Sequence, residues 1–176
     1  WHHIALVAGD ELVWILDPEN GEVLRTLMGH DTEVVDIASD EMGYRVITGS
    51  SDSRAIVWEA VDSLAVVESW SIAHERGVVA VAISADARVV ATADKTKALR
   101  LCDAEKQETL QIWPSAHRGQ INALALAADG ERLASASREE VRVFLLGEKE
   151  AVQVLGPHRA IVRAILFHED GERLVR

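Results

Sequence analysis

The chain has 176 residues, of which 48% are hydrophobic, so it can bury one sizeable core and does not have a disordered composition. Its formal net charge of −11 at pH 7 argues against sequence-independent binding to nucleic acid or to an anionic membrane, because both need a basic surface. No apolar run approaches the roughly 20 residues that a membrane-spanning helix needs. We therefore expect one folded domain that does not cross a membrane.

A single cysteine, Cys102, excludes an internal disulfide and a multi-cysteine zinc site. It fits a reducing compartment, so we expect a cytoplasmic protein, with the cilium, the cytoskeleton and the nucleus as further locations, and not a secreted one. The chain begins with Trp1 and enters the apolar run IALVAG almost at once. From this beginning we expect a piece of a longer chain.

One histidine context recurs four times along the chain. The spacings are 44, 43 and 41 residues between the four histidines, which are His30, His74, His117 and His158. Four residues after each histidine a short apolar run begins with a β-former: Val34, Val78, Ile121 and Val162. Short apolar runs bounded by turn residues are typical of buried strands, so each histidine is expected to precede a strand.

Three more strand-like runs follow in each unit. The Asp-Gly pairs at 129–130 and 170–171 predict hairpin turns after the first strand, because glycine tolerates a positive φ. The second strands end in VITGSSD, VVATADK and LASASRE, the third strands are RAIVWE, ALRLCD and VRVFLL, and the fourth are LAVVESW, ETLQIW and AVQVL. Four short strands per unit without helical periodicity predict an all-β fold of β-propeller blades.

The repeat divides the chain into five parts. Residues 1–29 are expected to supply the second, third and fourth strands of a partial blade. One four-stranded antiparallel blade each is expected from residues 30–73, 74–116 and 117–157, and the start of a further blade from 158–176. About four blades' worth of repeats are therefore present, in one continuous segment.

The units resemble the repeats of the WD40 family, whose signature is a Gly-His pair and a Trp-Asp pair that closes the third strand. The corresponding pairs are Gly29-His30 with Trp58-Glu59, Ala73-His74 with Cys102-Asp103, and Ala116-His117 with Phe144-Leu145. The partial first unit offers Leu16-Asp17, and the resemblance covers essentially the whole chain. Since such propellers close with about seven blades, we expect part of a larger propeller; a half-propeller that pairs with another chain, or one that closes alone, are the alternatives.

The histidines, hydroxyls and carboxylates of these units could form either a nucleophilic site or a structural network. The resemblance implies a hydrogen-bonded tetrad of loop histidine, second-strand hydroxyl, turn carboxylate and tryptophan. Its members would be His30, Thr48, Asp52 and Trp58; His74 and Thr92, with Thr96 and Cys102 at the other two places; and His117, Ser135, Glu139 and Phe144. Catalysis needs one such set beside a cleft, whereas stacked blades need it repeatedly, so no catalytic residue is expected. No metal site or cofactor is expected either.

Charged loops on one face are the candidate partner-binding surface. They are Asp31, Glu33, Ser51, Arg54, Glu75, Arg76, Lys95, Arg118, Arg138 and Arg159. Mixed signs of charge suit selective contacts with other proteins, although each of these residues could equally be a solvated loop residue. Trp70 and Trp113, near the ends of fourth strands, are either partner anchors or packing residues.

These observations favour a non-enzymatic scaffold that holds other proteins in a large assembly, for example a ciliary axoneme complex, a ribosome-assembly particle or a ubiquitin-ligase adaptor. The alternative is a sensor propeller fused to a signalling or nucleotide-binding module outside this segment. RNA association through Lys95, Lys97 and Arg100 is less favoured because the chain is acidic overall. No small-molecule ligand is evident from the sequence.

Overall fold

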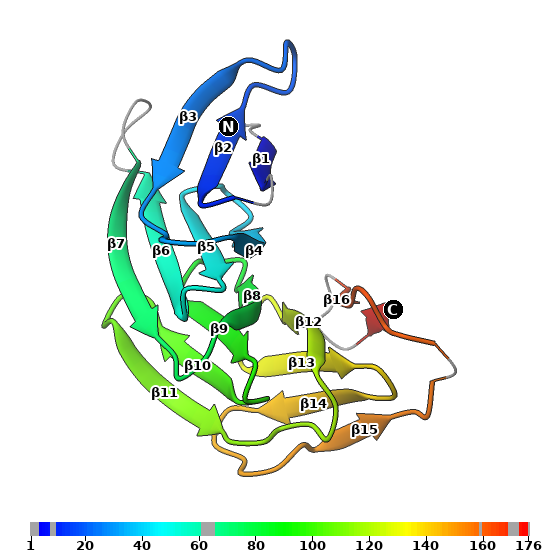
Figure 1. Ribbon diagram of the computed structural model, residues 1–176. Helices are drawn as coiled ribbons and strands as arrows, with labels where there is room; N and C mark the ends of the chain where they lie inside the picture. The colour runs from blue at the N-terminus through cyan, green and yellow to red at the C-terminus, as the bar shows by residue number, and fades with distance from the viewer. Residues whose placement is uncertain (1–3, 8–9, 61–65, 159, 169–172, 176) are drawn as a thin grey trace.

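The computed structural model describes residues 4–7, 10–60, 66–158, 160–168 and 173–175. This part of the chain forms seventeen β-strands and contains no helix, so none that could span a bilayer. The strands form five antiparallel sheets that stand one after another along an open arc (Figure 1). The prediction of an all-β fold built from propeller blades is confirmed, and the sheets do not close into a ring.

Three of the five sheets have four strands each, and two at the ends of the arc are smaller. The first sheet contains β1 (Ile4–Val7), β2 (Leu12–Leu16) and β3 (Val23–Met28). The complete blades are β4 (Val34–Ser39), β5 (Arg45–Ser50), β6 (Arg54–Ala60) and β7 (Val66–Ala73); β8 (Val78–Ile83), β9 (Val89–Asp94), β10 (Leu99–Asp103) and β11 (Glu108–Trp113); and β12 (Ile121–Leu126), β13 (Arg132–Ser137), β14 (Val141–Leu145) and β15 (Gln153–Leu155). The last sheet pairs β16 (Leu166–Phe167) with β17 (Leu174–Val175).

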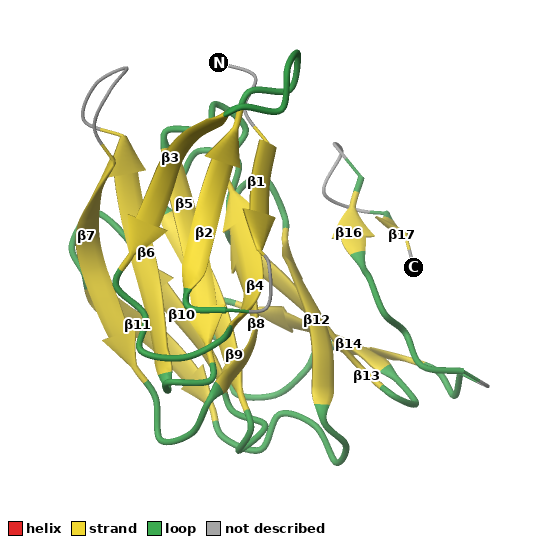
Figure 2. Cartoon of the chain, turned by 45° about the horizontal axis from the view of Figure 1, so that its top comes forward, coloured by secondary structure: helices red, strands yellow, loops and turns green. Residues whose placement is uncertain are grey.

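In each complete blade the strands pair in chain order, so the first strand lies at the inner edge and the fourth at the outer edge of the arc (Figure 1). The inner strands of neighbouring blades contact one another, β4 with β8 and β8 with β12. Figure 2 shows loops at both ends of these sheets, which leaves two loop-bearing faces on the arc. The smaller sheets extend the same order, since β1 contacts β4 and β12 contacts β16.

A β-bulge recurs at the same place in all three complete blades. The pairing of first with second strands shifts register after the first residue, between Val34 and Asp36, between Val78 and Ala80, and between Ile121 and Ala123. A bulge increases the local right-handed twist and turns the following side chains. In the first of these blades the turned residue is Asp36, whose carboxylate accepts a 2.8 Å hydrogen bond from the Val81 N–H of the next blade.

The hydrophobic core lies between the blades. The last two complete blades enclose the largest cluster, which includes Leu101, Trp113, Leu133 and Phe144. Similar clusters join each other pair of neighbouring sheets, around Ile15 and Trp58, around Val57 and Val81, and around Ala134 and Ile165. Alternating strand residues therefore face both neighbours, which explains why the strands carry long apolar runs.

Gly49 marks the closest approach between two blades, where β5 packs against β8. An ideal Cβ at this position would lie 2.6 Å from Val78 Cγ1 and 2.9 Å from Val81 Cγ1. Both valines are buried and β-branched, so neither side chain can move away from an added methyl group by changing its rotamer. A larger residue would have to separate the two blades.

We expect Gly49→Ala to lower the free energy of unfolding by about 1–3 kcal/mol, because the added methyl overpacks this interface. Urea unfolding followed by fluorescence measures the change. Gly119→Ala is the matched control, because its Cβ would meet no atom closer than Ser137 Cβ at 3.9 Å. Equal stability of the two variants would contradict the packing argument.

Candidate functional site

One face of the arc is formed by the loops before each first strand and the turns before each third strand. We call it the histidine face; it comprises loops 29–33, 74–77, 114–120 and 156–158 and turns 51–54, 95–98 and 138–140. Backbone hydrogen bonds fix loop to turn, from Ser51 N–H to the Glu33 carbonyl and from Lys95 N–H to the Gly77 carbonyl, both 3.0 Å. The loops of this face are therefore held by their own blades.

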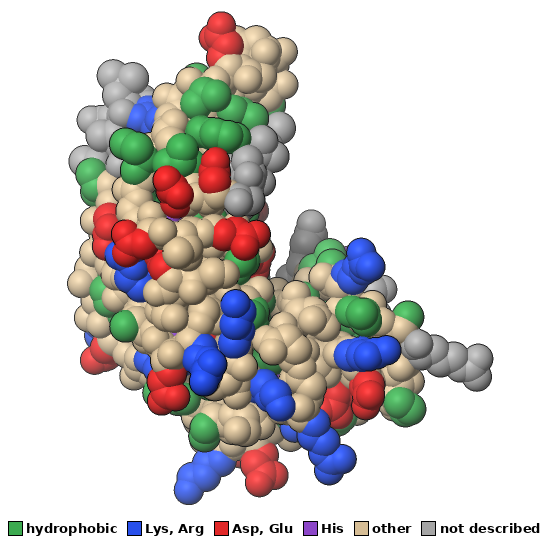
Figure 3. Space-filling model, in the orientation of Figure 1, with side chains coloured by type: hydrophobic (Ala, Val, Ile, Leu, Met, Phe, Trp, Pro, Cys, Tyr) green, Lys and Arg blue, Asp and Glu red, His purple; other side chains and the backbone are tan. Residues whose placement is uncertain are grey.

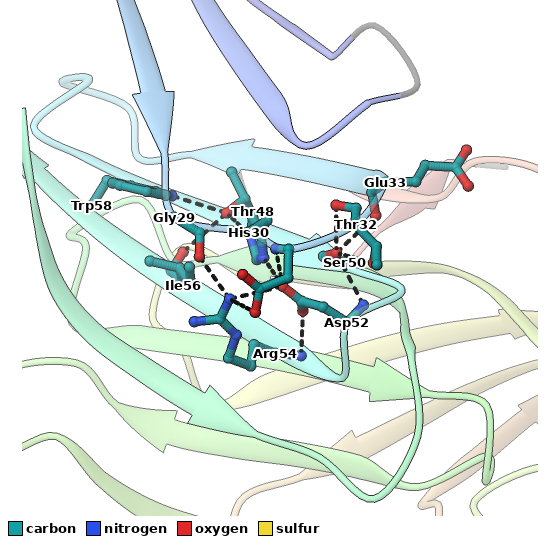
Figure 4. A network of polar contacts seen from close by, with 11 residues as sticks. Gly29, His30, Thr32, Glu33, Thr48, Ser50, Asp52, Arg54, Ile56 and Trp58 are labelled. Carbon is teal, nitrogen blue, oxygen red and sulfur yellow. Dashed lines mark hydrogen bonds and ion pairs between the residues drawn. The ribbon is translucent and has the colours of Figure 1, made fainter.

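The first complete blade adds a buried network of side chains below this face (Figure 4). His30, only 6% exposed, lies between two partners: its Nδ1 is 2.9 Å from Asp52 Oδ2 and its Nε2 is 2.7 Å from Thr48 Oγ1. The Trp58 indole N–H also donates to Thr48 Oγ1, at 2.9 Å. A carboxylate can only accept, so Nδ1 donates to it, and in a neutral imidazole Nε2 then accepts from the threonine hydroxyl.

Asp52 is held as a carboxylate by its surroundings. Burial by itself would raise its pKa, but hydrogen bonds from the Asp31 N–H, the His30 ring and the Arg54 N–H outweigh this and lower the pKa. The Arg54 guanidinium lies 3.1 Å from Asp52 and 3.0 Å from Asp31, and donates to the Gly29 carbonyl at 2.6 Å. Arg54 is therefore a member of this network.

In the second complete blade a carboxylate meets the histidine although the sequence offers only a threonine, Thr96, at the expected place. His74 Nδ1 lies 3.2 Å from Asp94 Oδ2, whereas Thr96, assigned from the sequence to the carboxylate position, donates its hydroxyl and its N–H to Asp94 Oδ1. Asp94 ends the second strand, two residues after Thr92, and reaches the histidine from there. The sequence placed Thr96 where the carboxylate should be and so predicted none in this blade; the structure supplies one from Asp94, because position in the turn does not decide which side chain reaches the ring.

The same blade leaves part of the network unpaired. Cys102 replaces the tryptophan, and its thiol lies 3.8 Å from Thr109 Oγ1. Within the described residues, His74 Nε2 and Thr92 Oγ1 are buried without a hydrogen-bond partner. Cys102 has no indole N–H, so the Thr92 hydroxyl receives no hydrogen bond like the one that Trp58 donates to the Thr48 hydroxyl.

In the third complete blade His117 Nε2 lies 2.7 Å from Ser135 Oγ, and the nearby carboxylate is Glu140, at 3.5 Å from Nδ1. Glu139, the residue assigned from the sequence, is instead exposed, and its carbonyl accepts from His158 N–H. The turn is one residue shorter here, which moves Glu139 to its tip and leaves Glu140 at the strand's start. Phe144 fills the tryptophan place and packs on Trp113, with ring centroids 5.1 Å apart.

Burial sets the protonation of two of these histidines. It lowers the pKa of His74, against the opposing effect of Asp94. For His117, burial and the nearby Arg142 guanidinium lower the pKa to about 4, although Glu140 acts in the other direction. Both rings are therefore neutral at pH 7 and can accept a hydrogen bond at one nitrogen.

This arrangement suits a structural joint. The hydroxyls of Thr48 and Ser135 are in side chains with no exposed surface, where a substrate could not reach them. Among the described residues no group of three or more His, Cys, Asp or Glu side chains could hold a metal ion. The chemistry available to the network is to satisfy buried polar groups and to fix the loop.

The expected partner-binding residues that the structure describes all lie on the histidine face, and they differ in exposure. The exposed residues are Asp31, Glu33, Glu75, Arg76, Lys95, Arg118 and Arg138, while Ser51 and Arg54 are partly buried. Arg159 lies outside the described residues. Of the two tryptophans, Trp113 is 3% exposed and donates to the Glu148 carbonyl, and Trp70 packs against the core, so both are packing residues.

Sequence reasoning missed Asp94, Glu140 and the bridging role of Arg54. Asp94 was available as the acidic residue next to the expected turn, and Glu140 as the neighbour of the assigned residue. Neither carried a signal that ranked it above its neighbours, because which carboxylate meets a ring depends on where the backbone turns.

Repeated four-stranded blades, each with a loop histidine beside the hydroxyl-bearing residue of its second strand, define a β-propeller assembled from repeats. The family described as WD domain, G-beta repeat (WD40) matches residues 21–59 and 107–144. These two segments are therefore WD40 repeats. Each match runs from the outer strand of one sheet, β3 or β11, to the third strand of the next, β6 or β14. No curated protein matches the chain.

We expect Thr48→Val to lower the free energy of unfolding by about 1–3 kcal/mol, because the His30 and Trp58 ring nitrogens lose their buried partner. Thr92→Val is the matched variant: its hydroxyl has no partner among the described residues, so its loss is expected to be neutral or stabilising. Thermal and urea unfolding of both variants test this pair. If both variants lost the same free energy of unfolding, the proposed difference between the two networks would be wrong.

We also expect the stability to fall as the pH is lowered from 6.5 to about 4. In this range unfolded histidine, with a pKa near 6.5, binds a proton that folded His117 does not. The slope contributed by this histidine is at most about 1.4 kcal/mol per pH unit. Urea midpoints from pH 4 to pH 8 measure it, with His117→Gln as the comparison.

The variant is expected to show a shallower slope than the wild type in that window. The lowered pKa values of Asp52 and Asp94 also make stability fall with pH, but mainly at and below the unfolded value of 3.8, so between about pH 5 and pH 6.5 the slope comes from histidine. An unchanged slope in the variant would show that His117 is not neutral in the folded protein.

Proposed function

We propose that the chain is a non-enzymatic scaffold that holds other proteins together in a multi-subunit assembly. WD40 repeats are typical of protein-interaction scaffolds. The observation that carries the proposal is a set of exposed charged side chains on loops whose backbone is fixed by buried networks. Such a surface can contact other proteins, whereas the histidines and hydroxyls that could act in catalysis are buried beneath it.

Rigid loops favour selective binding because little conformational freedom is lost when a partner docks. The loop around Asp31 is held from below by Asp52, which accepts its N–H at 3.0 Å, and from the side by Arg54. The next loop is fixed by His74 N–H, which donates to the Ser53 carbonyl of the preceding blade at 2.9 Å. Each blade therefore presents its charged tips in a defined position relative to the next.

A reducing compartment, with the cytoplasm foremost, forms part of the same proposal. It rests on Cys102, which is completely buried and whose thiol pKa is raised by that burial, so the group behaves as a small core residue. A buried unreactive thiol suits a protein whose stability does not depend on disulfides.

Purification of the tagged protein from its source, followed by native mass spectrometry, tests the scaffold. We expect the protein to travel with other subunits in a fixed stoichiometry. Reversal of two exposed acids on the histidine face, Glu33→Lys with Glu75→Lys, should change the recovery of at least one partner by about tenfold or more, because charge complementarity guides such contacts.

Glu19→Lys with Glu131→Lys is the matched control, with the same change in charge on exposed residues away from the histidine face. It should recover the partners as the wild type does. Recovery of the protein without any partner would contradict the scaffold. The intact mass from a denatured sample would also reveal a fused signalling module, the alternative expectation.

A further inference from the structure

Charge is unevenly distributed on the histidine face. Around the first complete blade its loops carry carboxylates at Asp31 and Glu33, and the preceding sheet adds Asp10 and Glu11 beside them, since the Asp10 carbonyl accepts from the Val34 N–H at 2.9 Å. The loops and turns of the next two blades carry instead a group of cations that we call the basic arc: Arg76, Lys95, Lys97, Arg118 and Arg138. In Figure 3 acidic side chains gather over the region of β4 to β6 and basic ones below them, over the region from β8 to β14.

The basic arc is continuous in space although its members are far apart in the sequence. Lys95 Nζ lies 3.3 Å from the place where a Gly77 Cβ would stand, beside Arg76. Lys97 Nζ donates to the Arg118 carbonyl at 2.7 Å. A Cβ on Gly119 would stand 3.9 Å from Ser137, the residue before Arg138. Two blades thus contribute to one positive strip.

The cations of the basic arc are not neutralised by described carboxylates. None of the five forms an ion pair with a described residue, although Glu75 and Glu139 are sequence neighbours of two of them. The opposite face differs, because Arg88 lies 3.9 Å from Glu105 and Lys106 lies 3.3 Å from Asp103. In a chain with 29 acidic and 18 basic residues, five adjacent cations without an acidic partner are an unbalanced positive surface.

We propose that the basic arc binds an acidic polypeptide segment of a partner protein. This inference rests on the scaffold function and specifies the chemistry of one partner. The acidic loops around Asp31 and Glu33 repel the same segment, so the bound chain is confined to the two blades of the arc. Charge complementarity on one half of the face and repulsion on the other fix where the partner docks.

A polypeptide fits this surface better than a nucleic acid does. The loops of the basic arc carry no Phe, Tyr or Trp on which bases could stack. The exposed carboxylates of Glu75 and Glu139 lie between the cations and would repel the continuous phosphate backbone of a nucleic acid. The net charge of −11 on the chain adds to this repulsion. A segment with spaced carboxylates can pass such interruptions.

Fluorescence polarisation of the protein with a labelled peptide of about 12 residues, alternating Glu and Ser, tests the proposal directly. We expect saturable binding that weakens about tenfold or more when salt is raised from about 50 to about 300 mM. The Gln-Ser peptide of equal length should not bind. A single-stranded oligonucleotide of the same length and sedimentation of the protein alone test the competing occupants, nucleic acid and a second copy.

The triple variant Arg76→Gln, Lys95→Gln and Arg118→Gln should lose at least about tenfold in affinity for the acidic peptide, since three attractive charges are removed. The matched control, Arg88→Gln with Lys106→Gln, should bind as the wild type does. Melting curves of both should stay close to the wild type, because the changed side chains are exposed. This check separates lost binding from lost folding.

Three results would overturn the proposal: no binding of the acidic peptide, an equal loss in both variants, or tighter binding of the oligonucleotide. Self-association that the triple variant abolishes would also overturn it, in favour of a second copy whose acidic loops occupy the arc. Each outcome is distinguishable from failure of the scaffold function. Co-purified subunits would remain in the source complex if only the identity of the ligand were wrong.

Discussion

The contact between the His30 ring and the Thr48 hydroxyl, at 2.7 Å inside the first complete blade, is the interaction on which the histidine face depends. It joins the loop that enters the blade to the second strand, and it does so where water cannot replace a lost partner. Asp52 and Trp58 complete the joint by orienting the ring and supplying a donor. The position of the loop that carries Asp31 and Glu33 follows from this attachment.

The other two complete blades differ in this joint. His117 keeps it, with Nε2 2.7 Å from Ser135 Oγ, whereas His74 Nε2 and Thr92 Oγ1 have no hydrogen-bond partner among the described residues and His74 is held through Asp94 instead. Asp94 and Glu140 supply carboxylates from other backbone positions, and Cys102 and Phe144 replace the indole. In the last of these blades an apolar contact occupies the tryptophan place, where Phe144 packs on Trp113. The repeat is therefore tolerant in its polar members as long as the loop remains attached and the interface between blades remains filled.

Net charge and local charge lead to different conclusions about this surface. The value of −11 describes the whole chain, whereas a partner docking on the histidine face meets acidic loops on one side and the basic arc on the other. Basic residues on the opposite face are largely engaged with nearby carboxylates, which leaves them less available to a partner. Separation of charge on a rigid face can orient a partner as well as attract it.

The sequence by itself determined the strand content and the blade repeat, because these follow from spacing and hydrophobic pattern, while the resemblance to WD40 repeats implied the places of His30, Thr48, Asp52 and Trp58. The tertiary structure decided which carboxylate meets each remaining histidine, since a turn one residue shorter redirects Glu139 and lets Glu140 approach. The sequence had already placed Arg76, Lys95 and Arg118 on one face; the tertiary structure decided that none of them forms an ion pair with a described carboxylate, because such pairs depend on where side chains lie once strands pair and blades stack.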